Sequence, residues 1–183
     1  SVDRISSGDV ICLHACCHNP TGVDPTDQQW QQIAALCNDR NILPLIDFAY
    51  QGFGNGITED AAALIPFQQG GKEFIVCSSF SKNFGLYGER IGALTIVSED
   101  DNTAAVTLSH AKRAVRTNYS NPPKHGGAIV STVLSDEQLR AQWEAEVAQM
   151  RNRINDMRDK FVNAMQQRNA PVDFGFIQSQ RGM

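Results

Sequence analysis

The stretch EFIVCSSFSKNFGLYGERIG, residues 73–92, decides how the rest of the chain is interpreted. It opens with a short, almost continuous apolar run, which is typical of a buried strand. The run ends in a turn where Lys82 is framed by Ser79 and Ser81 and followed by Arg90. A lysine at a strand end is usually solvated, but in a small, partly desolvated turn its pKa falls and its amine becomes a nucleophile. The remainder of the chain decides between these two interpretations.

Strand-like and helix-like segments alternate along most of the chain, which indicates an α/β fold with a mostly parallel sheet covered by helices on both faces. The expected strands are Asp9–Ala15, Ile42–Phe48, Glu73–Phe80 and Arg90–Ser98, and helices are expected over Thr26–Arg40 and Asn102–Thr117. Thr26 and Gln29 have the spacing of a capping box. The third and fourth strands are close in sequence, which favours an antiparallel pairing because a parallel return needs a longer crossover.

One long helix is expected from Ser135 to about Arg168, with Ser135 and Gln138 at capping distance. Its apolar residues repeat at steps of three and four and are expected to form a core face: Leu139, Trp143, Val147, Met150, Ile154, Met157, Phe161 and Met165. At 1.5 Å per residue the helix spans about 50 Å, which exceeds the needs of a small domain. A coiled coil is one interpretation. We favour a helix, residues 135–168, that joins part of a large domain (1–134) to the start of a small C-terminal domain (169–183).

Composition and charge exclude several classes of protein. The 183 residues are 42% hydrophobic and 20% charged with a net charge of −4, so nucleic acid and anionic membrane are not expected partners. No apolar run reaches membrane-spanning length, and no signal peptide is expected. The five cysteines are expected to be reduced thiols, which favours the cytoplasm. The chain begins without Met and ends as if entering a strand, so we expect it to be a fragment.

Two stretches resemble ligand sites but are interpreted as structural. Cys12, His14 and Cys16 share one face of an extended strand, where their side chains do not converge on one ion, so no metal is expected. We place His14 near the bound ligand instead. The GFGNG stretch, residues 52–56, lacks the spacing of a dinucleotide loop and is expected to be a flexible turn.

Polar side chains stand at the ends of three expected strands. Asn19 lies in the turn HNPTG, Asp47 and Tyr50 end the second strand, and Lys82 follows the third. Ligands of parallel sheets bind at the carboxyl ends of the strands, so these residues are expected to converge on one crevice. A carboxylate at the tip of an apolar strand also needs a cation or a strong donor.

Pyridoxal phosphate accounts for all of these groups. Lys82 would form a Schiff base with its aldehyde, and Asp47 would keep the ring nitrogen protonated. Asn19 and Tyr50 would hydrogen-bond its phenolic oxygen. The phosphate would be bound by three further residues: Ser79, Ser81 and Arg90.

The motifs HNPTG, DFAYQGF and SSFSKNFGLYGERIG together resemble the aspartate aminotransferase branch of the class I aminotransferases. The resemblance covers essentially the whole chain and implies the fold-type-I architecture of pyridoxal-phosphate-dependent transferases. It assigns the same roles: Lys82, Asp47 and Tyr50 in catalysis, and Asn19, Ser79, Ser81 and Arg90 in cofactor binding. Gly88 stands where many relatives carry asparagine.

The resemblance also implies a substrate and an assembly. VRTNYSNPP is similar to the family segment whose arginine, Arg116 here, reaches across a homodimer to the distal carboxylate of a dicarboxylic substrate. Asn19 is the second substrate-binding residue. The implied reaction transfers an amino group between aspartate or glutamate and 2-oxoacids, in active sites shared by two subunits. Because other parts of the family site lie beyond this chain, the chain alone is expected to be inactive.

Three alternatives remain open from the sequence. An aromatic amino acid aminotransferase can also retain Arg116. A fold-type-I lyase or decarboxylase shares Lys82 and Asp47 but has no need of Arg116. A cofactor-binding regulatory module would be non-catalytic.

Overall fold

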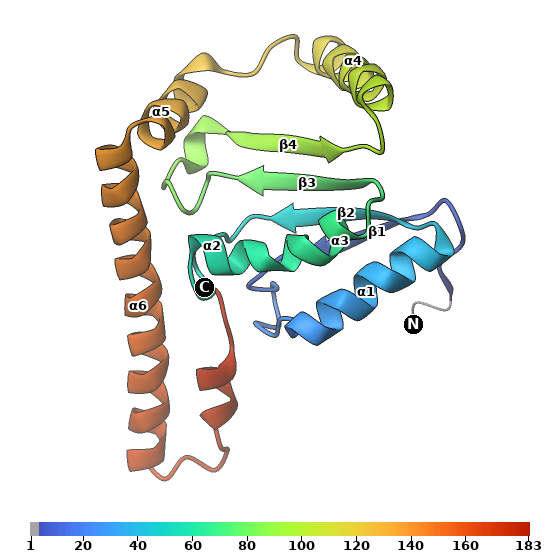
Figure 1. The fold of residues 1–183 in the computed structure, drawn as a ribbon. Helices are drawn as coiled ribbons and strands as arrows, with labels where there is room; N and C mark the ends of the chain where they lie inside the picture. The colour runs from blue at the N-terminus through green and yellow to red at the C-terminus, as the bar shows by residue number, and fades with distance from the viewer. Residues whose placement is uncertain (1–3) are drawn as a thin grey trace.

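A computed structural model describes residues 4–183 and has a four-stranded sheet at its centre (Figure 1). The strands β1 (Val10–His14), β2 (Leu43–Phe48), β3 (Phe74–Ser79) and β4 (Gly92–Val97) lie in that order across the sheet. β1, β2 and β3 are parallel, and β4 pairs antiparallel to β3. The predicted α/β class, the mostly parallel sheet and the antiparallel fourth strand are therefore confirmed. The first three residues of the predicted 1–134 region lie outside the described residues.

The register of the sheet aligns one residue of each strand in a single row. His14 pairs with Asp47, Asp47 with Cys77, and Cys77 with Leu94. Since successive residues of a strand point to opposite faces, these four side chains share one face. All four are partly or wholly exposed, whereas Ile46, on the opposite face of β2, is fully buried.

Helices bury that opposite face. They are α1 (Asp27–Arg40), α2 (Ile57–Asp60), the 3₁₀ segment η2 (Ala61–Leu64) and α3 (Ile65–Gln69). The predicted capping box is confirmed, because Gln29 N donates to Thr26 Oγ1 and Thr26 N donates to Gln29 Oε1. Trp30 of α1 packs edge-on against Phe67 of α3, which packs against Phe74 of β3. The segments between residues 57 and 69 were not expected from the sequence.

The cover expected on the second face of the sheet is not seen among residues 4–183. Both connections, from β1 to β2 and from β2 to β3, step in the same direction across the sheet. Right-handed crossovers that step the same way place their helices on the same side. Figure 1 shows α1 and α3 on one side of the strands. Among the described residues, α1 and α3 therefore leave the face that carries Asp47 uncovered.

The chain after β3 passes through a short 3₁₀ segment, η3 (Tyr87–Glu89), and continues beyond β4 as α4 (Asp101–Asn118) and α5 (Lys124–Ser135). The helix predicted for Asn102–Thr117 is confirmed. Thr103 N donates to Asp100 Oδ1, which caps α4. α4 buries none of its residues and lies beyond the edge strand β4 (Figure 1).

The predicted long helix is confirmed as α6 (Glu137–Gln167), which runs past the carboxyl ends of β2 and β3 (Figure 1). Its predicted cap is wrong by one residue. Ser135 belongs to α5, and Asp136 accepts hydrogen bonds from Gln138 N and Leu139 N. A carboxylate is the better cap here because it accepts both orphan N–H groups.

The inner face of α6 is only partly the predicted one. Val147 and Val162 are buried, and the Trp143 ring stacks on Phe84 with 4.6 Å between centroids. Four predicted core residues are instead 38–47% exposed: Leu139, Met150, Met157 and Phe161. The helix is rotated so that arginines occupy part of its inner face: Arg151 donates to the Gly52 carbonyl, and Arg158 donates to the Gly182 carbonyl.

The segment after α6 turns back along the helix (Figure 1). It contains the 3₁₀ segment η4 (Gly175–Ser179) where the sequence suggested the start of a strand. Arg181 N then donates to the Gly22 carbonyl at 2.8 Å. The division into domains 1–134, 135–168 and 169–183 stays a prediction.

Two further findings concern the cysteines and the possibility of a membrane-spanning helix. All five cysteines are free thiols. Between residues 4 and 183, no helix is both long enough and apolar enough to cross a bilayer.

Candidate active site

Three strand ends carry the predicted site residues. The parallel strands β1, β2 and β3 end on the same edge of the sheet, and Figure 1 shows the arrowheads of β2 and β3 pointing towards α6. Asn19 lies in the loop after β1, Asp47 and Tyr50 lie at the end of β2, and Lys82 follows β3. This arrangement agrees with the predicted convergence at the carboxyl ends of the strands.

Tyr50 connects the other two strand ends. Asn19 Nδ2 donates a hydrogen bond to Tyr50 Oη at 3.3 Å. The amine of Lys82 lies over the Tyr50 ring, 4.1 Å from its centroid. Asn19, Tyr50 and Lys82 therefore form one contiguous group from three separate loops. The ring also offers the ammonium a cation–π contact that leaves all three of its N–H donors available.

The loop that carries Asn19 is held by a carboxylate. Asp24 accepts hydrogen bonds from Cys17 N at 2.7 Å and from His18 N at 2.8 Å. Gly22 N closes the loop by donating to the His18 carbonyl at 2.7 Å. Cys17 has a φ of 54°, a left-handed conformation that is unusual for a residue with a side chain. The surrounding contacts fix this loop in one conformation.

The turn after β2 is fixed in the same way by a residue that the sequence did not point to. Asp60 is 6% exposed and accepts backbone N–H bonds from Gly52, Gly54 and Asn55 at 2.7–3.0 Å. Several N–H groups around one carboxylate satisfy a buried charge that would otherwise be costly. Residues 52–56 therefore form a turn, as predicted, but the turn is held by hydrogen bonds rather than flexible. The acidic residue shortly after a glycine-rich stretch was the available signal.

The carboxylate of Asp47 has no partner in the described part of the chain. It is half-buried beside Cys77, and no described side chain or N–H group bonds to its oxygens. Burial raises the pKa of the Cys77 thiol, and the nearby charge of Asp47 raises it further. The Lys82 amine likewise has no ion pair with any described residue. An acid and an amine are thus both available to a ligand at this edge of the sheet.

The predicted phosphate-binding residues lie on the β3–β4 connection. Ser81 is buried, and its N–H donates to Ser79 Oγ at 3.2 Å. Arg90 is exposed, has a left-handed φ of 50°, and donates through Nη1 to the Tyr87 carbonyl at 3.1 Å. The antiparallel return of β4 brings Arg90 back to the turn that begins at Ser79, because Ser79 pairs with Gly92.

Arg116 stands apart from this group. It lies in the last turn of α4 and donates to Ser120 Oγ. It is exposed, and no hydrogen bond or ion pair joins it to the other predicted site residues. The described chain therefore does not place Arg116 in the same site as Lys82.

His14 lies next to Asp47 across the sheet, as expected for a residue near the site. Its Nδ1 accepts a hydrogen bond from Asn19 N at 3.4 Å, and its ring centroid is 4.8 Å from that of His18. No group of three or more metal-ligating side chains was found within residues 4–183.

Comparison with known proteins identifies this arrangement. Residues 1–183 match the family described as Aminotransferase class I and II. The chain belongs to the class I and II aminotransferases. The aspartate aminotransferases of Haemophilus influenzae and Escherichia coli are 54% and 53% identical to it, over 182 and 183 residues. The tyrosine aminotransferase of Klebsiella pneumoniae is 46% identical over 182 residues.

Each of these alignments covers 100% of the chain and 46% of the relative, so the chain spans about half the length of the aminotransferases it matches. Among solved structures, an aromatic-amino-acid aminotransferase from Burkholderia pseudomallei, covalently bound to pyridoxal phosphate, superposes with a TM-score of 0.97. It is 49% identical, and the match covers 100% of this chain and 46% of that one. The predicted family and the predicted fold-type-I architecture are confirmed.

The sequence did not point to one further residue beside this candidate site. Asn83 is 2% exposed and follows Lys82 directly. Its Nδ2 donates to the Gln51 carbonyl at 3.2 Å, and its own carbonyl accepts from Trp143 Nε1 at 2.8 Å. Asn83 therefore ties the lysine turn to the turn after β2 and to α6. Only the adjacent lysine marked this position in the sequence.

Proposed function

We propose that the protein carrying this chain is a pyridoxal-phosphate-dependent aminotransferase for aspartate and glutamate. The observation that carries the proposal is the group formed by Lys82, Tyr50 and Asn19. At the same edge of the sheet, the carboxylate of Asp47 has no hydrogen-bonded partner among residues 4–183. The overall reaction moves the amino group of aspartate to 2-oxoglutarate, which gives oxaloacetate and glutamate. The identity to two aspartate aminotransferases, 54% and 53%, is higher than the 46% and 49% to two relatives named for aromatic substrates, which supports this substrate class.

The residues present fit the proposed cofactor by the chemistry of their donors. Pyridoxal phosphate has an aldehyde, a ring nitrogen, a phenolic oxygen and a phosphate. Among residues 4–183, the chain offers an amine with no ion pair, a carboxylate with no hydrogen-bonded partner, a phenol with an amide, and a turn with two serines and an arginine. When bound, the cofactor supplies an electron sink that stabilises negative charge at the substrate Cα.

Each residue would have a defined task in this proposal. Lys82 would hold the cofactor through its aldehyde and would also carry a proton to and from the substrate Cα. Asp47 holds a proton on the ring nitrogen. Asn19 and Tyr50 donate hydrogen bonds to the phenolic oxygen. Ser79, Ser81 and Arg90 bind the phosphate, for which a guanidinium offers a bidentate fork.

We assign substrate selection to Arg116 and to a homodimer. The exposed guanidinium at the end of α4 would complete the site of the second subunit, where it would bind the distal carboxylate of aspartate or glutamate. Its position outside the Lys82 group supports a role in trans. The free thiols support a reducing compartment, and we place the protein in the cytoplasm.

An aromatic substrate preference is the second candidate. The similarity to the Klebsiella pneumoniae tyrosine aminotransferase and to the Burkholderia pseudomallei structure favours it. These identities, 46% and 49%, are lower than those to the aspartate aminotransferases. Family membership leaves less support for a lyase, a decarboxylase or a regulatory module.

A screen of amino donors tests the proposal. The protein should be made at the length of its relatives, loaded with pyridoxal phosphate and mixed in turn with aspartate, glutamate, phenylalanine and lysine. We expect the cofactor absorbance to change fastest with aspartate and glutamate. A faster change with phenylalanine would assign the aromatic preference, and release of ammonia or CO₂ without amino transfer would overturn the proposal.

A further inference from the structure

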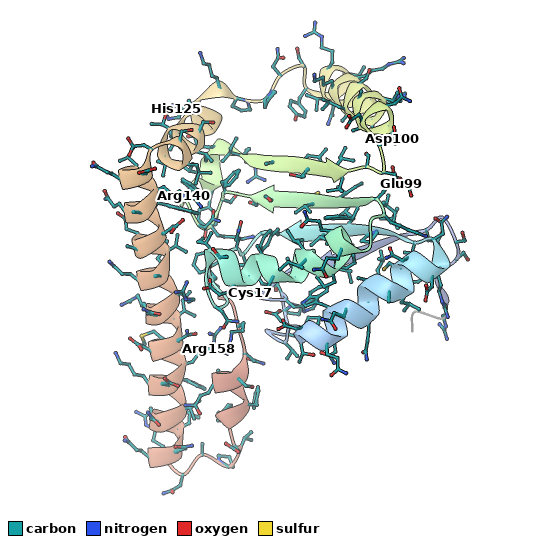
Figure 2. All side chains as sticks on the ribbon, in the orientation of Figure 1. Cys17, Glu99, Asp100, His125, Arg140 and Arg158 are labelled. Atoms are coloured by element: carbon teal, nitrogen blue, oxygen red, sulfur yellow. The ribbon has the colours of Figure 1, made fainter. Side chains whose placement is uncertain are left out.

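The C-terminal segment of the chain is held against the loop that carries Asn19. Arg181 N donates to the Gly22 carbonyl at 2.8 Å, and Arg158 of α6 donates through Nη2 to the Gly182 carbonyl. Figure 2 shows Arg158 between α6 and this returning segment. Residues far apart in sequence thus form one three-layer contact: the helix, residues 180–183, and the loop of residues 17–22.

This contact is too close to admit side chains at two positions. A Cβ on Gly22 would lie 2.8 Å from Gln180 Cβ, and a Cβ on Gly182 would lie 2.7 Å from Cys17 Cβ. Both glycines also have left-handed φ angles, 65° and 87°. The two backbones therefore approach each other as only glycine allows. This close packing of two backbones indicates a specific contact between the segments rather than a segment that lies loosely on the surface.

The contact borders the proposed cofactor residues. Asn19, Tyr50, Arg158, Arg181 and Met183 line one small polar cavity between the loop and the segment. Asn19 is exposed in the described chain and its side chain is fixed by a single 3.3 Å bond to Tyr50. Its orientation consequently depends on how firmly the loop backbone is held from the other side.

We propose that Arg158 is a positioning residue that clamps residues 180–183 onto the 17–22 loop and so fixes Asn19 for its contact with Tyr50. A guanidinium suits this task because its planar fork reaches two acceptors at once. Arg158 Nη1 donates to Asn155 Oδ1 at 2.9 Å while Nη2 donates to Gly182. It has no carboxylate partner within residues 4–183, so the peptide carbonyl is its main polar contact. A lysine would supply the charge but not the fork.

Amide hydrogen exchange tests the clamp. The protein should be made at the full length of its relatives and studied without the cofactor. Arg158→Met keeps the apolar stem and removes the fork. We expect amides of residues 17–22 and 180–183 to exchange at least about tenfold faster, because the local opening of both segments becomes easier. Lys160→Met, at an exposed position of the same helix that lines no cavity with residues 180–183, is the control and should change neither segment. Unchanged exchange of residues 17–22 in Arg158→Met would overturn the clamp.

The consequence for the cofactor rests on the function proposed above and has its own measurement. Donors from Asn19 and Tyr50 favour the anionic phenolic oxygen and so favour loss of the proton at the Lys82 nitrogen. If Asn19 is held less firmly, the absorbance of the bound cofactor should change at a higher pH. We expect the midpoint of this pH titration to rise by about one pH unit. Arg158→Lys should give a smaller rise than Arg158→Met.

The two proposals fail in different ways. If the unsubstituted protein shows no cofactor absorbance that depends on Lys82, the proposed function is wrong, while the exchange comparison still decides the clamp. If Arg158→Met leaves the midpoint unchanged but lowers the free energy of unfolding, Arg158 is structural only, and its positioning role is wrong.

Discussion

The Lys82 amine lies over the aromatic face of Tyr50, with 4.1 Å between the nitrogen and the ring centroid. The phenol oxygen of the same Tyr50 accepts a hydrogen bond from Asn19. One tyrosine thus positions a cation by its ring and an amide by its hydroxyl. The two groups predicted to meet the aldehyde and the phenolic oxygen of one cofactor are held by a single side chain.

We predict that Lys82 is the residue that binds pyridoxal phosphate. Borohydride reduction of the loaded protein, followed by peptide mapping, should place the cofactor on the peptide that contains Lys82. Lys82→Ala should remove the label. A label on Lys72, which donates to the Asn38 carbonyl, would mean that the strand-end lysine is only solvated.

Asp47→Ala is expected to slow proton removal from the substrate by several orders of magnitude, because the ring nitrogen loses the carboxylate that keeps it protonated. The fold should persist, since the Asp47 carboxylate has no hydrogen-bonded partner to lose among the described residues and the backbone bonds of residue 47 remain. Single-turnover rates with aspartate and with Cα-deuterated aspartate measure this step. Normal turnover in the variant would rule out the proposed role at the ring nitrogen.

The thiol of Cys77 reports on the charge of Asp47. Burial and the Asp47 carboxylate both raise the pKa of Cys77, since each disfavours the thiolate. Asp47→Asn removes the second cause, so the pKa of Cys77 should fall. Alkylation of Cys77 should then become faster at about pH 8, a pH close to the ordinary thiol pKa of ~8.5, where a fall in pKa increases the thiolate fraction. Cys37 is the matched control, because burial alone raises its pKa. Equal acceleration at both thiols would indicate loosening of the fold rather than loss of a charge.

Arg116 should decide between dicarboxylic and uncharged substrates. Arg116→Asp is expected to lower kcat/KM for aspartate by a factor of hundreds or more, since the proposed dimer would bury the pair of Arg116 and the substrate carboxylate, and loss of a buried, charged pair costs about 3–5 kcal/mol. The value for phenylalanine should fall much less or rise. Arg113→Asp on the same helix is exposed and serves as the control for added charge. Equal losses on both substrates would make Arg116 structural.

Asp60→Ala is expected to lower the free energy of unfolding by about 3 kcal/mol, because four backbone N–H groups, three of them buried, lose their shared acceptor. Urea unfolding of the full-length protein measures this change. The same substitution at the exposed neighbour Glu59 should have little effect. If the two variants were equally stable, the turn after β2 would not depend on the carboxylate.

Local patterns were sufficient to predict the strand ends and the residues on them. Short, mostly apolar runs define β1, β2 and β3, and the polar side chains that follow such runs lie at the edge of a parallel sheet. That is why the sequence alone groups Asn19, Tyr50 and Lys82. The antiparallel β4 followed from the shortness of its connection.

Contacts between distant segments could not be predicted in this way. The role of Asp60 depends on backbone N–H groups that converge only after the turn has folded. Arg151 and Arg158 occupy inner positions of α6 and bond to carbonyl groups of other segments. Periodicity predicts apolar residues at inner positions. The predicted inner face of α6 was therefore rotated relative to the observed one, and Met150 and Met157 were wrongly placed in the core.

The hairpin formed by β3 and β4 limits how this region can tolerate insertions and deletions. Ser79 pairs with Gly92, and Phe80 N donates to the Ile91 carbonyl, so both ends of the connection are fixed in one register. The amine of Lys82 and the guanidinium of Arg90 are carried on this single closed segment. A single-residue insertion beyond the turn would shift the pairing by one and send every following side chain of β4 to the other face. Insertions and deletions among homologues are therefore expected in other loops, which do not connect two paired antiparallel strands.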